Sequence, residues 1–396
     1  MVEVTSYADA REAFRHRDLR QALYDDGHRL MSDVIVNLHG DEHIARRRLE
    51  NRLFRRDTFA WYEHEHIPEI LDRVIKPAAA TGSGELLDLA RRAMIRLSVD
   101  VAGVDVDDTA FERFYGLMNA MAAAATVVHA VGDVESVIKA GDEALATFDR
   151  DFYQPSRARR LALIEADQPA RDVLTTLLVN QDELDLASDT VLREVAYYPW
   201  VGAHSTSAQL VHAMHHLFDW IEAHPADSDL LTTDDVLRQR FVHESMRLHP
   251  ASPVAVRRAM TDLTLKTGVS ITRGEMVTVN VEQANRDPLV FGDNADEFDP
   301  YRPVPEGVAR WGLSFGSGTH ACVGRALAAG LEAHEVIDYE LVGTVSLMAG
   351  RLLASGAAID PTRPAELDTE TTRSVWGCYP VIFDPERVLS SRDVER

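Results

Sequence analysis

One short stretch, residues 314–328, gathers side chains that could bind a metal. It reads SFGSGTHACVGRALA and holds Cys322, one of only two cysteines in the chain, two positions after His320. Good helix formers follow directly, so we expect a helix over 323–336 with Cys322 at its N-terminal end. Backbone N–H groups and the positive end of the helix dipole stabilise a thiolate at that position. The pattern predicts a thiolate positioned to bind a metal.

Three glycines shape the same loop. Gly316 and Gly318 permit a tight turn and a close approach to a flat ligand, and Gly324 lets the first helical turn press against that ligand. His320 can donate a hydrogen bond to an anionic group at the ligand's edge. Together these features indicate a planar cofactor that carries a metal. The stretch 316–321 also fits a Gly-x-Gly-x-x-Ala dinucleotide fingerprint, but the sequence pattern around it lacks the βαβ units that such a site needs.

Residues 315–328 resemble the heme-binding loop of the cytochrome P450 family, which reads Phe-Gly-x-Gly-x-(His or Arg)-x-Cys-x-Gly. Every fixed position is met. The resemblance implies a heme b cofactor whose iron is ligated by the cysteine thiolate, the arrangement that favours cleavage of the O–O bond. It assigns five residues to cofactor binding, with the phenylalanine packed near the sulfur: Phe315, Gly316, His320, Cys322 and Gly324.

Two further motifs resemble those with which the family binds the heme carboxylates. HIARR supplies a His-x-x-x-Arg pair, His43 and Arg47, whose spacing places both side chains on one helix face. VRRAMTD resembles the strand that supplies another arginine, here Arg257. Bidentate arginine donors suit buried carboxylates. The resemblance therefore adds His43, Arg47 and Arg257 to the cofactor-binding set.

The family's Glu-x-x-Arg pair is matched by ESMR, as Glu244 and Arg247. ANRDP at 284–288 and FDPYRP at 298–303 resemble the segment whose arginine, here Arg302, completes an ion network with that pair. We expect this network to be buried and structural, since buried charges must be fully satisfied. The five ordered motifs cover roughly residues 5–385.

A long central helix is expected to carry the catalytic residues. The family pattern (Ala or Gly)-Gly-x-(Asp or Glu)-Thr is matched in VGAHSTSAQ at 201–209, where Gly202 and Ala203 precede Ser205 and Thr206. The resemblance assigns Thr206, Ser205 and Ala203 to catalysis. Ser205 stands where the family has an acid, and a hydroxyl cannot hold a proton in reserve as a carboxyl can. Either His204 or the substrate helps, or the chemistry is atypical: oxidative coupling, nitration, dehydration or a peroxide-driven oxidation.

The substrate is expected to be an apolar small molecule. By resemblance, the pocket candidates are Tyr198, Gly202, Ala203, Thr206, Val254 and Val256. The segment between the first helix, near 7–18, and the next, starting near 41, is short. In the family this segment roofs the pocket, so we expect an open pocket or one that another protein or subunit closes.

Composition restricts the partners. The 396 residues carry a net charge of −23, which argues against nucleic-acid binding, and no stretch is apolar enough for a signal peptide or a membrane anchor. Two cysteines 56 positions apart fit a reducing cytoplasm. Residues 45–56 hold six arginines and one glutamate, so we expect them to dock an acidic ferredoxin-type electron donor on the cysteine side of the heme.

The elements that position these residues are mainly helical. We expect a single heme domain over 1–396 with the cytochrome P450 fold, mainly α with small β-sheets, and the heme between the long central helix and the cysteine-loop helix. Alternation and turn glycines predict strands within 253–282, and a strand pair is expected near 372–383. Two alternatives carry less weight: a metal at His212 and His216, spaced i, i+4, and a reactive Cys378, more simply explained as a packed thiol.

Overall fold

The computed structural model describes residues 2–332, 335 and 340–384. It is mainly α with small sheets, as expected. The helices and short helical turns are α1 (Tyr7–Arg15), α2 (His28–Met31), α3 (Gly40–Glu50), α4 (Arg56–Trp61), η1 (Tyr62–His66), α5 (Ile67–Thr81), α6 (Leu86–Ala102), α7 (Phe111–Ala125), η2 (Val127–His129), α8 (Val134–Phe148), η3 (Asp149–Tyr153), α9 (Gln154–Glu165), α10 (Val173–Val179), α11 (Ser188–Ala223), η4 (Pro225–Asp227), α12 (Ser228–Thr233), α13 (Asp235–Leu248), α14 (Val281–Ala284), α15 (Pro288–Phe291), η5 (Gly318–His320), α16 (Arg325–Ala329) and α17 (Thr344–Ala354).

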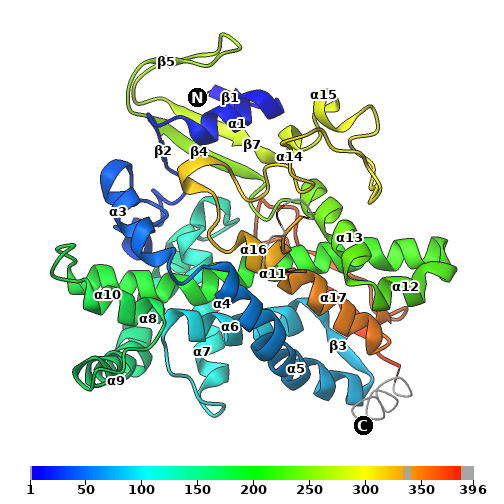
Figure 1. The fold of residues 1–396 in the computed structure, drawn as a ribbon, viewed down its shortest axis with the longest axis horizontal. Coiled ribbons are helices and arrows are strands. Elements are labelled where there is room, and N and C mark those ends of the chain that lie inside the picture. Colours follow the sequence, from blue (N-terminus) through cyan, green and yellow to red (C-terminus); the bar gives the residue numbers. More distant parts are fainter. Residues whose placement is uncertain (1, 333–334, 336–339, 385–396) are drawn as a thin grey trace.

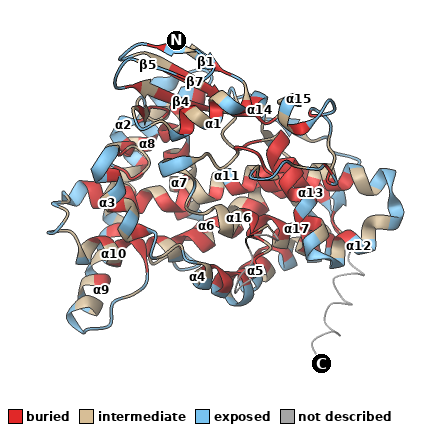
Figure 2. Cartoon of the chain, turned by 45° about the horizontal axis from the view of Figure 1, so that its top comes forward, coloured by how far each residue is buried: buried red, intermediate tan, exposed pale blue. Residues whose placement is uncertain are grey.

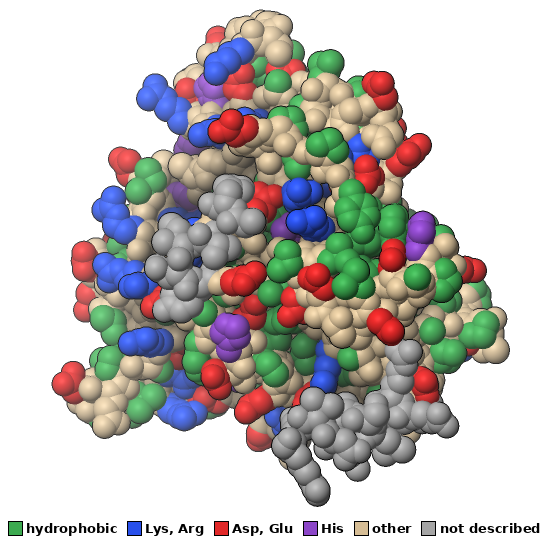
Figure 3. Space-filling model, turned by 45° about the vertical axis from the view of Figure 1, so that its right-hand side comes forward, with side chains coloured by type: hydrophobic (Ala, Val, Ile, Leu, Met, Phe, Trp, Pro, Cys, Tyr) green, Lys and Arg blue, Asp and Glu red, His purple; other side chains and the backbone are tan. Residues whose placement is uncertain are grey.

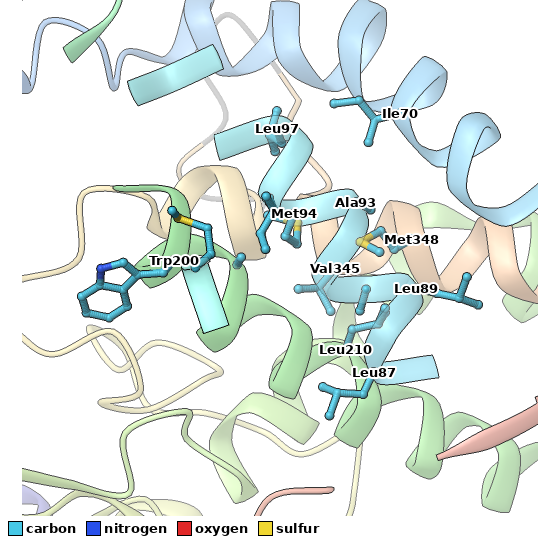
Figure 4. Packing of buried hydrophobic residues seen from close by; sticks show 14 of the residues in the cluster. Ile70, Leu87, Leu89, Ala93, Met94, Leu97, Trp200, Leu210, Val345 and Met348 are labelled. Atoms are coloured by element: carbon cyan, nitrogen blue, oxygen red, sulfur yellow. The ribbon is translucent and has the colours of Figure 1, made fainter. Parts of the chain in front are cut away.

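The longest helix, α11, has 36 residues and runs through the middle of the molecule (Figure 1). It packs along α6 and also contacts α13 and α17, and buried residues concentrate in these four helices (Figure 2). Figure 4 shows side chains of α6, such as Met94, gathered with Leu210 of α11 and Val345 of α17. This continuous apolar packing fixes α11, and with it any side chain that α11 presents to a ligand.

A four-stranded sheet in the order β1-β7-β4-β2 lies at the top of Figure 1. β1 (Val2–Val4) pairs in parallel with β7 (Met276–Asn280), while β4 (Val254–Ala259) runs antiparallel to both β7 and β2 (Leu19–Gln21). A hairpin of β5 (Leu263–Thr264) and β6 (Ser270–Ile271) lies between β4 and β7 in the sequence. The strands expected within 253–282 are therefore confirmed.

Two strands are present near 372–383, as expected, but they do not pair with each other. β10 (Trp376–Cys378) pairs with β9 (Glu366–Leu367), whereas β11 (Pro380–Ile382) pairs with β3 (Ser83–Glu85) and β8 (Ala358–Ile359). Only Tyr379 separates β10 from β11, which is too short for the turn of a hairpin between them. The two strands therefore enter different sheets.

The helix expected over 323–336 is also corrected. α16 begins at Arg325 and ends at Ala329, because Gly330 takes a φ of +76°, in the left-handed region. Gly343, with a φ of +91°, lies directly against it: a Cβ on Gly343 would stand 2.4 Å from the Ala329 carbonyl carbon. The Leu331 N–H donates to the Leu341 carbonyl at 2.8 Å, and α17 begins one residue after Gly343. Residues 333–334 and 336 of the expected helix lie outside the described residues.

The predicted ion network of Glu244, Arg247 and Arg302 is confirmed. Arg247 donates to both Glu244 carboxylate oxygens at 2.8 and 2.6 Å, and Arg302 Nε donates to Glu244 Oε1 at 3.1 Å. Other N–H groups of the same two guanidinium groups donate to backbone carbonyls: Arg247 to that of Asn285 and Arg302 to that of Phe291. Because every charge here has partners, the network can be buried without a large desolvation penalty.

A second buried network was not predicted. Arg46 Nη1 lies 3.0 Å from Glu194 Oε2 on α11 and 3.8 Å from Glu50 Oε1 on α3. The Tyr198 hydroxyl donates to Glu50, and the Ile35 N–H donates to Glu194 at 2.8 Å. One guanidinium thus faces two fully buried carboxyl groups, and each carboxyl has one oxygen with no hydrogen-bond partner. Burial accordingly raises the pKa of Glu50 to about 7 and that of Glu194 well above its usual value.

Glu50→Gln should change how stability depends on pH. Because the folded-state pKa of Glu50 is raised from 4.5 to about 7, native protein binds more protons than unfolded protein between those values. Wild-type stability is fully present below about pH 4.5 and falls as the pH rises to 7, by at most about 3 kcal/mol for this group. Urea unfolding of Glu50→Gln should show a shallower fall and higher stability at pH 8.

Glu42→Gln, an exposed change on the same helix, is the matched control. It should leave the wild-type pH profile in place. A Glu50→Gln profile that parallels wild type from pH 4.5 to 8 would contradict the assignment of a protonated carboxyl to this network.

Candidate active site

A cavity of about 770 Å³ is lined by α11 and by the loop 313–328 that carries Cys322. Other parts of its wall come from α6, α7, β4, the segment before α3, and the segments 129–137 and 368–373. The roof residues Leu23, Tyr24, Ile35 and Val36 line it, so the short segment between α1 and α3 does reach the cavity.

Cys322 presents its sulfur to this cavity. The Cys322 N–H donates to the Phe315 carbonyl at 2.9 Å, and the backbone N–H groups of Gly324 and Arg325 stabilise the charged form of Sγ. Burial raises the pKa of the thiol, while those two N–H groups and the Arg47 and Arg325 guanidinium groups lower it. The first effect is larger, so a metal cation at Sγ is what would favour the thiolate here.

The loop glycines act in two ways. Gly316 and Gly324 line the cavity together with Phe315, and a Cβ on Gly324 would stand 4.0 Å from the Cys322 sulfur. Gly318 does not line the cavity, so the expected approach to a flat ligand is wrong for this residue. A Cβ on Gly318 would stand 3.1 Å from the Cα of Arg15 in α1, and its φ is +76°. It therefore allows the loop to pack against α1.

Two arginines face the cavity without a protein counter-charge. Arg47 donates to the Ala321 carbonyl, and Arg257, almost fully buried, donates to the Gln21 side chain and the Val256 carbonyl. Neither forms an ion pair with any residue in the described parts of the chain. Two guanidinium groups beside the cysteine, that of Arg257 buried and that of Arg47 partly buried, match the two carboxylates of a heme in charge and number, so the residues present fit that cofactor.

His43 and His320 support the same edge of the cavity. Their rings stack with centroids 3.9 Å apart, and His43 Nε2 is buried without a hydrogen-bond partner. Burial and neighbouring cations lower the pKa of His43 to about 4 and that of His320 to about 3, so both rings are neutral near pH 7. His320 lines the cavity, whereas His43 lies behind it.

Two residues of strand β4 were expected to line the pocket and do not. Val254 and Val256 do not line the cavity; Ala255 and Arg257 do. Side chains on a strand alternate between its two faces, so the placement of Arg257 inward turns both valines to the opposite face.

On α11, four expected residues line the cavity: Tyr198, Gly202, Ser205 and Thr206. Ala203 is fully buried but is not part of the lining, so the expectation that it faces the pocket is wrong. The helical period explains this, because 198, 202, 205 and 206 share one face, from which 203 is turned by about 100°. The Ser205 hydroxyl donates to the Val201 carbonyl at 2.8 Å.

Sequence reasoning missed several polar residues of the cavity wall, namely Tyr24, Arg91, Asn119, His129 and Arg373. Neighbouring residues in the sequence predict that a charged helix residue such as Arg91 is exposed to solvent. The available signal was its spacing from Met94, Ser98 and Val101, which places all four on one face of α6, and all four line the cavity.

The two alternative metal and thiol sites gain no support. His216 Nε2 lies 3.0 Å from His249 Nε2, and the His212 ring stacks on His249 at 4.3 Å. Among the residues that the structure describes, no group of three or more His, Cys, Asp or Glu side chains is arranged to hold a metal ion. Cys378 lies in β10, outside the cavity lining.

The six arginines of residues 45–56 have different surroundings. Arg46 is buried in its carboxyl network and Arg56 bonds the Glu335 carbonyl, while Arg48, Arg52 and Arg55 are exposed. Arg55 pairs with Asp57 at 3.2 Å, whereas Arg48 and Arg52 have no ion-pair partner among the described residues. On the face in Figure 3, acidic and basic side chains are interspersed. No described helix has the length and apolar character needed to span a bilayer.

Comparison with known proteins points to one family. The family model described as Cytochrome P450 matches residues 236–330, which include the Glu244–Arg247 pair and the cysteine loop. Pulcherriminic acid synthase of Bacillus subtilis is 23% identical over 340 residues, covering 82% of this chain and 78% of that protein. Cytochrome P450 BJ-3 of Bradyrhizobium diazoefficiens is 30% identical over 260 residues, covering 62% of this chain and 56% of that protein.

Solved structures share the fold. The crystal structure of CalO2 superposes with a TM-score of 0.75 at 21% identity, over 97% of this chain and 90% of that one. P450BioI, solved with a hexadec-9Z-enoic acid-ligated acyl carrier protein, gives 0.76 at 18% identity, over 96% and 91%. The solved structures show the fold. The family model and the relatives, together with the cysteine loop, identify the chain as a member of the cytochrome P450 family and an oxidoreductase, a monooxygenase whose cofactor is heme b.

Proposed function

We propose that this enzyme oxidises a small organic substrate at a heme held by Cys322, with electrons from a separate ferredoxin-type protein. The observation that carries the proposal is that Cys322 lines the cavity beside two arginines, Arg47 and Arg257, that have no ion-pair partner among the described residues. When bound, the heme supplies the activation of dioxygen. The absence of a disulfide among the described residues is in keeping with a role in the cytoplasm.

The residues of the cavity wall bind the cofactor, exclude water and orient the substrate. Arg47, Arg257 and His320 bind the heme carboxylates, while Phe315 limits the access of water to the Cys322 sulfur. The Thr206 hydroxyl makes no hydrogen bond to a described residue, so it is available to orient a water or a substrate group in the cavity. Aromatic and aliphatic side chains, including Trp200 and Met94, exclude water from the substrate.

Cys322→His tests the ligand assignment. An imidazole in place of the thiolate should abolish the red-shifted absorbance band of the reduced carbon monoxide complex while leaving heme bound. Cys378→Ser is the matched control and should keep the wild-type band. If Cys322→His retains that band, Cys322 is not the ligand, and the proposed function loses its central residue.

The proposed docking site for the electron donor is the exposed part of residues 45–56. It lies beside the cysteine loop, because Arg47 donates a hydrogen bond to the Ala321 carbonyl of that loop. Arg48→Glu and Arg52→Glu should each slow reduction by an acidic ferredoxin about threefold or more at low salt, and should flatten its salt dependence. Stopped-flow reduction measures both effects. Arg273→Glu, an exposed change in the β6–β7 turn, should match wild type. Unchanged rates in both charge reversals would refute docking at this site.

Ser205 favours a second candidate, atypical chemistry at the same heme. Its hydroxyl is engaged with the Val201 carbonyl, and no carboxyl stands beside Thr206 on this face of α11. One relative, matched over 26% of this chain, is named indoleacetaldoxime dehydratase. A dehydration would need no externally supplied proton reserve of the kind that a carboxyl provides.

Ser205→Asp separates the two candidates. In a monooxygenase that lacks a proton reserve, the new carboxyl should raise the product formed per NADH consumed and lower the release of hydrogen peroxide. Ser205→Asn, which has a similar shape without the ionisable group, should not. A wild type that is already tightly coupled and is not improved by Asp would show that protons reach the site by another route. Product formed without consumption of NADH would favour the atypical chemistry.

A further inference from the structure

Besides Gln209 of α11, whose amide nitrogen donates to the His249 carbonyl, three side chains on the cavity wall each have a buried polar atom without a hydrogen-bond partner. They are Arg91 of α6, Asn119 of α7 and His204 of α11. Arg91 Nε, Asn119 Oδ1 and His204 Nε2 are all buried from solvent and all lack a hydrogen-bond partner. Buried polar atoms are nearly always satisfied, so three orphans on the wall of one cavity point to a ligand that completes them.

Arg91 has no counter-charge in the described protein. The nearest carboxylate along its helix, Asp88, is already occupied, accepting from Arg92 Nε at 2.6 Å and from the Tyr115 hydroxyl at 2.8 Å. Arg91 itself forms no hydrogen bond or ion pair with a described residue. A guanidinium in an enclosed cavity is costly unless an anion accompanies it.

A second cation reinforces this positive region. Arg373 lines the same cavity, and its side chain bonds only the neighbouring Thr371. Asp368 attracts it without a direct ion pair. Arg91 and Arg373 act together on His204: burial first and then these two cations lower its pKa to about 3. The imidazole is therefore neutral near pH 7 and adds a donor without adding charge.

The carboxylates of the cavity lining do not neutralise these arginines by direct pairing. Asp133 caps α8 through the Ser136 N–H at 3.1 Å, and Asp368 accepts the Glu370 N–H at 2.8 Å. Glu370 is exposed at the rim, where the Val131 N–H donates to its carbonyl. The positive charge of the interior is therefore left for a ligand to match.

We propose that Arg91, with Arg373 and His204, binds a carboxylate of the substrate, so that the substrate is an amphiphilic acid and not a wholly apolar molecule. Asn119 Oδ1 is an acceptor and pairs with a hydroxyl or N–H on the same molecule. The apolar part then lies along Met94 and Val101, which share the Arg91 face of α6. This inference rests on the proposed function, because it assigns the substrate class of the same site.

The test uses ω-(imidazol-1-yl)alkanoic acids of eight to twelve carbons and their matched primary amides. The imidazole reports binding through the heme absorbance, and the series varies the reach to Arg91. In wild type, at least one acid should bind about tenfold or more tightly than its amide, as expected for a charge-assisted hydrogen bond. Arg91→Gln should remove that preference and leave amide affinity near wild type, while Arg91→Lys should keep part of it.

Arg96→Gln is the matched control, because Arg96 lies on the same helix but pairs outward with Asp108 at 3.1 Å. It should preserve the acid preference. If no acid of the series binds wild type more tightly than its amide, or if Arg91→Gln retains the preference, the inference is overturned. An Arg91→Gln protein that fails to fold leaves the wild-type comparison and Arg91→Lys to decide.

Failure of the proposed function looks different. If the protein binds no heme, none of the probes would shift an absorbance band. The acid–amide comparison would then be made by isothermal titration calorimetry, which needs no heme signal and still decides whether the cavity selects a carboxylate.

Discussion

The constraint on which this structure depends is the cost of charge in an enclosed cavity. Arg47, Arg257 and Arg91 carry guanidinium groups that face the same interior without protein carboxylates to match them. Burial likewise disfavours the Cys322 thiolate. The buried Glu244 carboxylate, by contrast, is paired with two arginines. The unpaired groups around the cavity therefore mark where cofactor and substrate complete the electrostatics of the protein.

Short motifs with fixed spacing could be predicted from the sequence. The cysteine loop, the arginines of the heme edge and the Glu244 network each depend on local geometry or on pairs that the family resemblance identifies. The strands within 253–282 followed from alternation and glycine turns. In most of these cases the information lies within a few residues of the position concerned, whereas Arg302, 58 positions from Glu244, was assigned by the family resemblance.

Features set by distant packing could not be predicted in this way. Arg46 lies in a basic stretch that reads as exposed, yet it is buried against Glu194, 148 positions away. Val254 and Val256 were misplaced for another reason, since strand alternation and the inward Arg257 already excluded them. Arg91 was missed because a charged helix position gives no local sign that its neighbours form the wall of a cavity.

The contact between Gly330 and Gly343 bears on how this protein can vary. Helix α16 ends at Ala329 and helix α17 begins at Thr344. Gly330 and Gly343, which follow and precede these two residues, are in direct contact. The ends of the joining segment are fixed as well, since Leu331 and Leu341 are buried with Phe59 and Ala60. An evolving lineage, or an engineer, can therefore add residues between those two leucines while α16 and α17 keep their contact, because insertions are tolerated where the ends of a segment already meet.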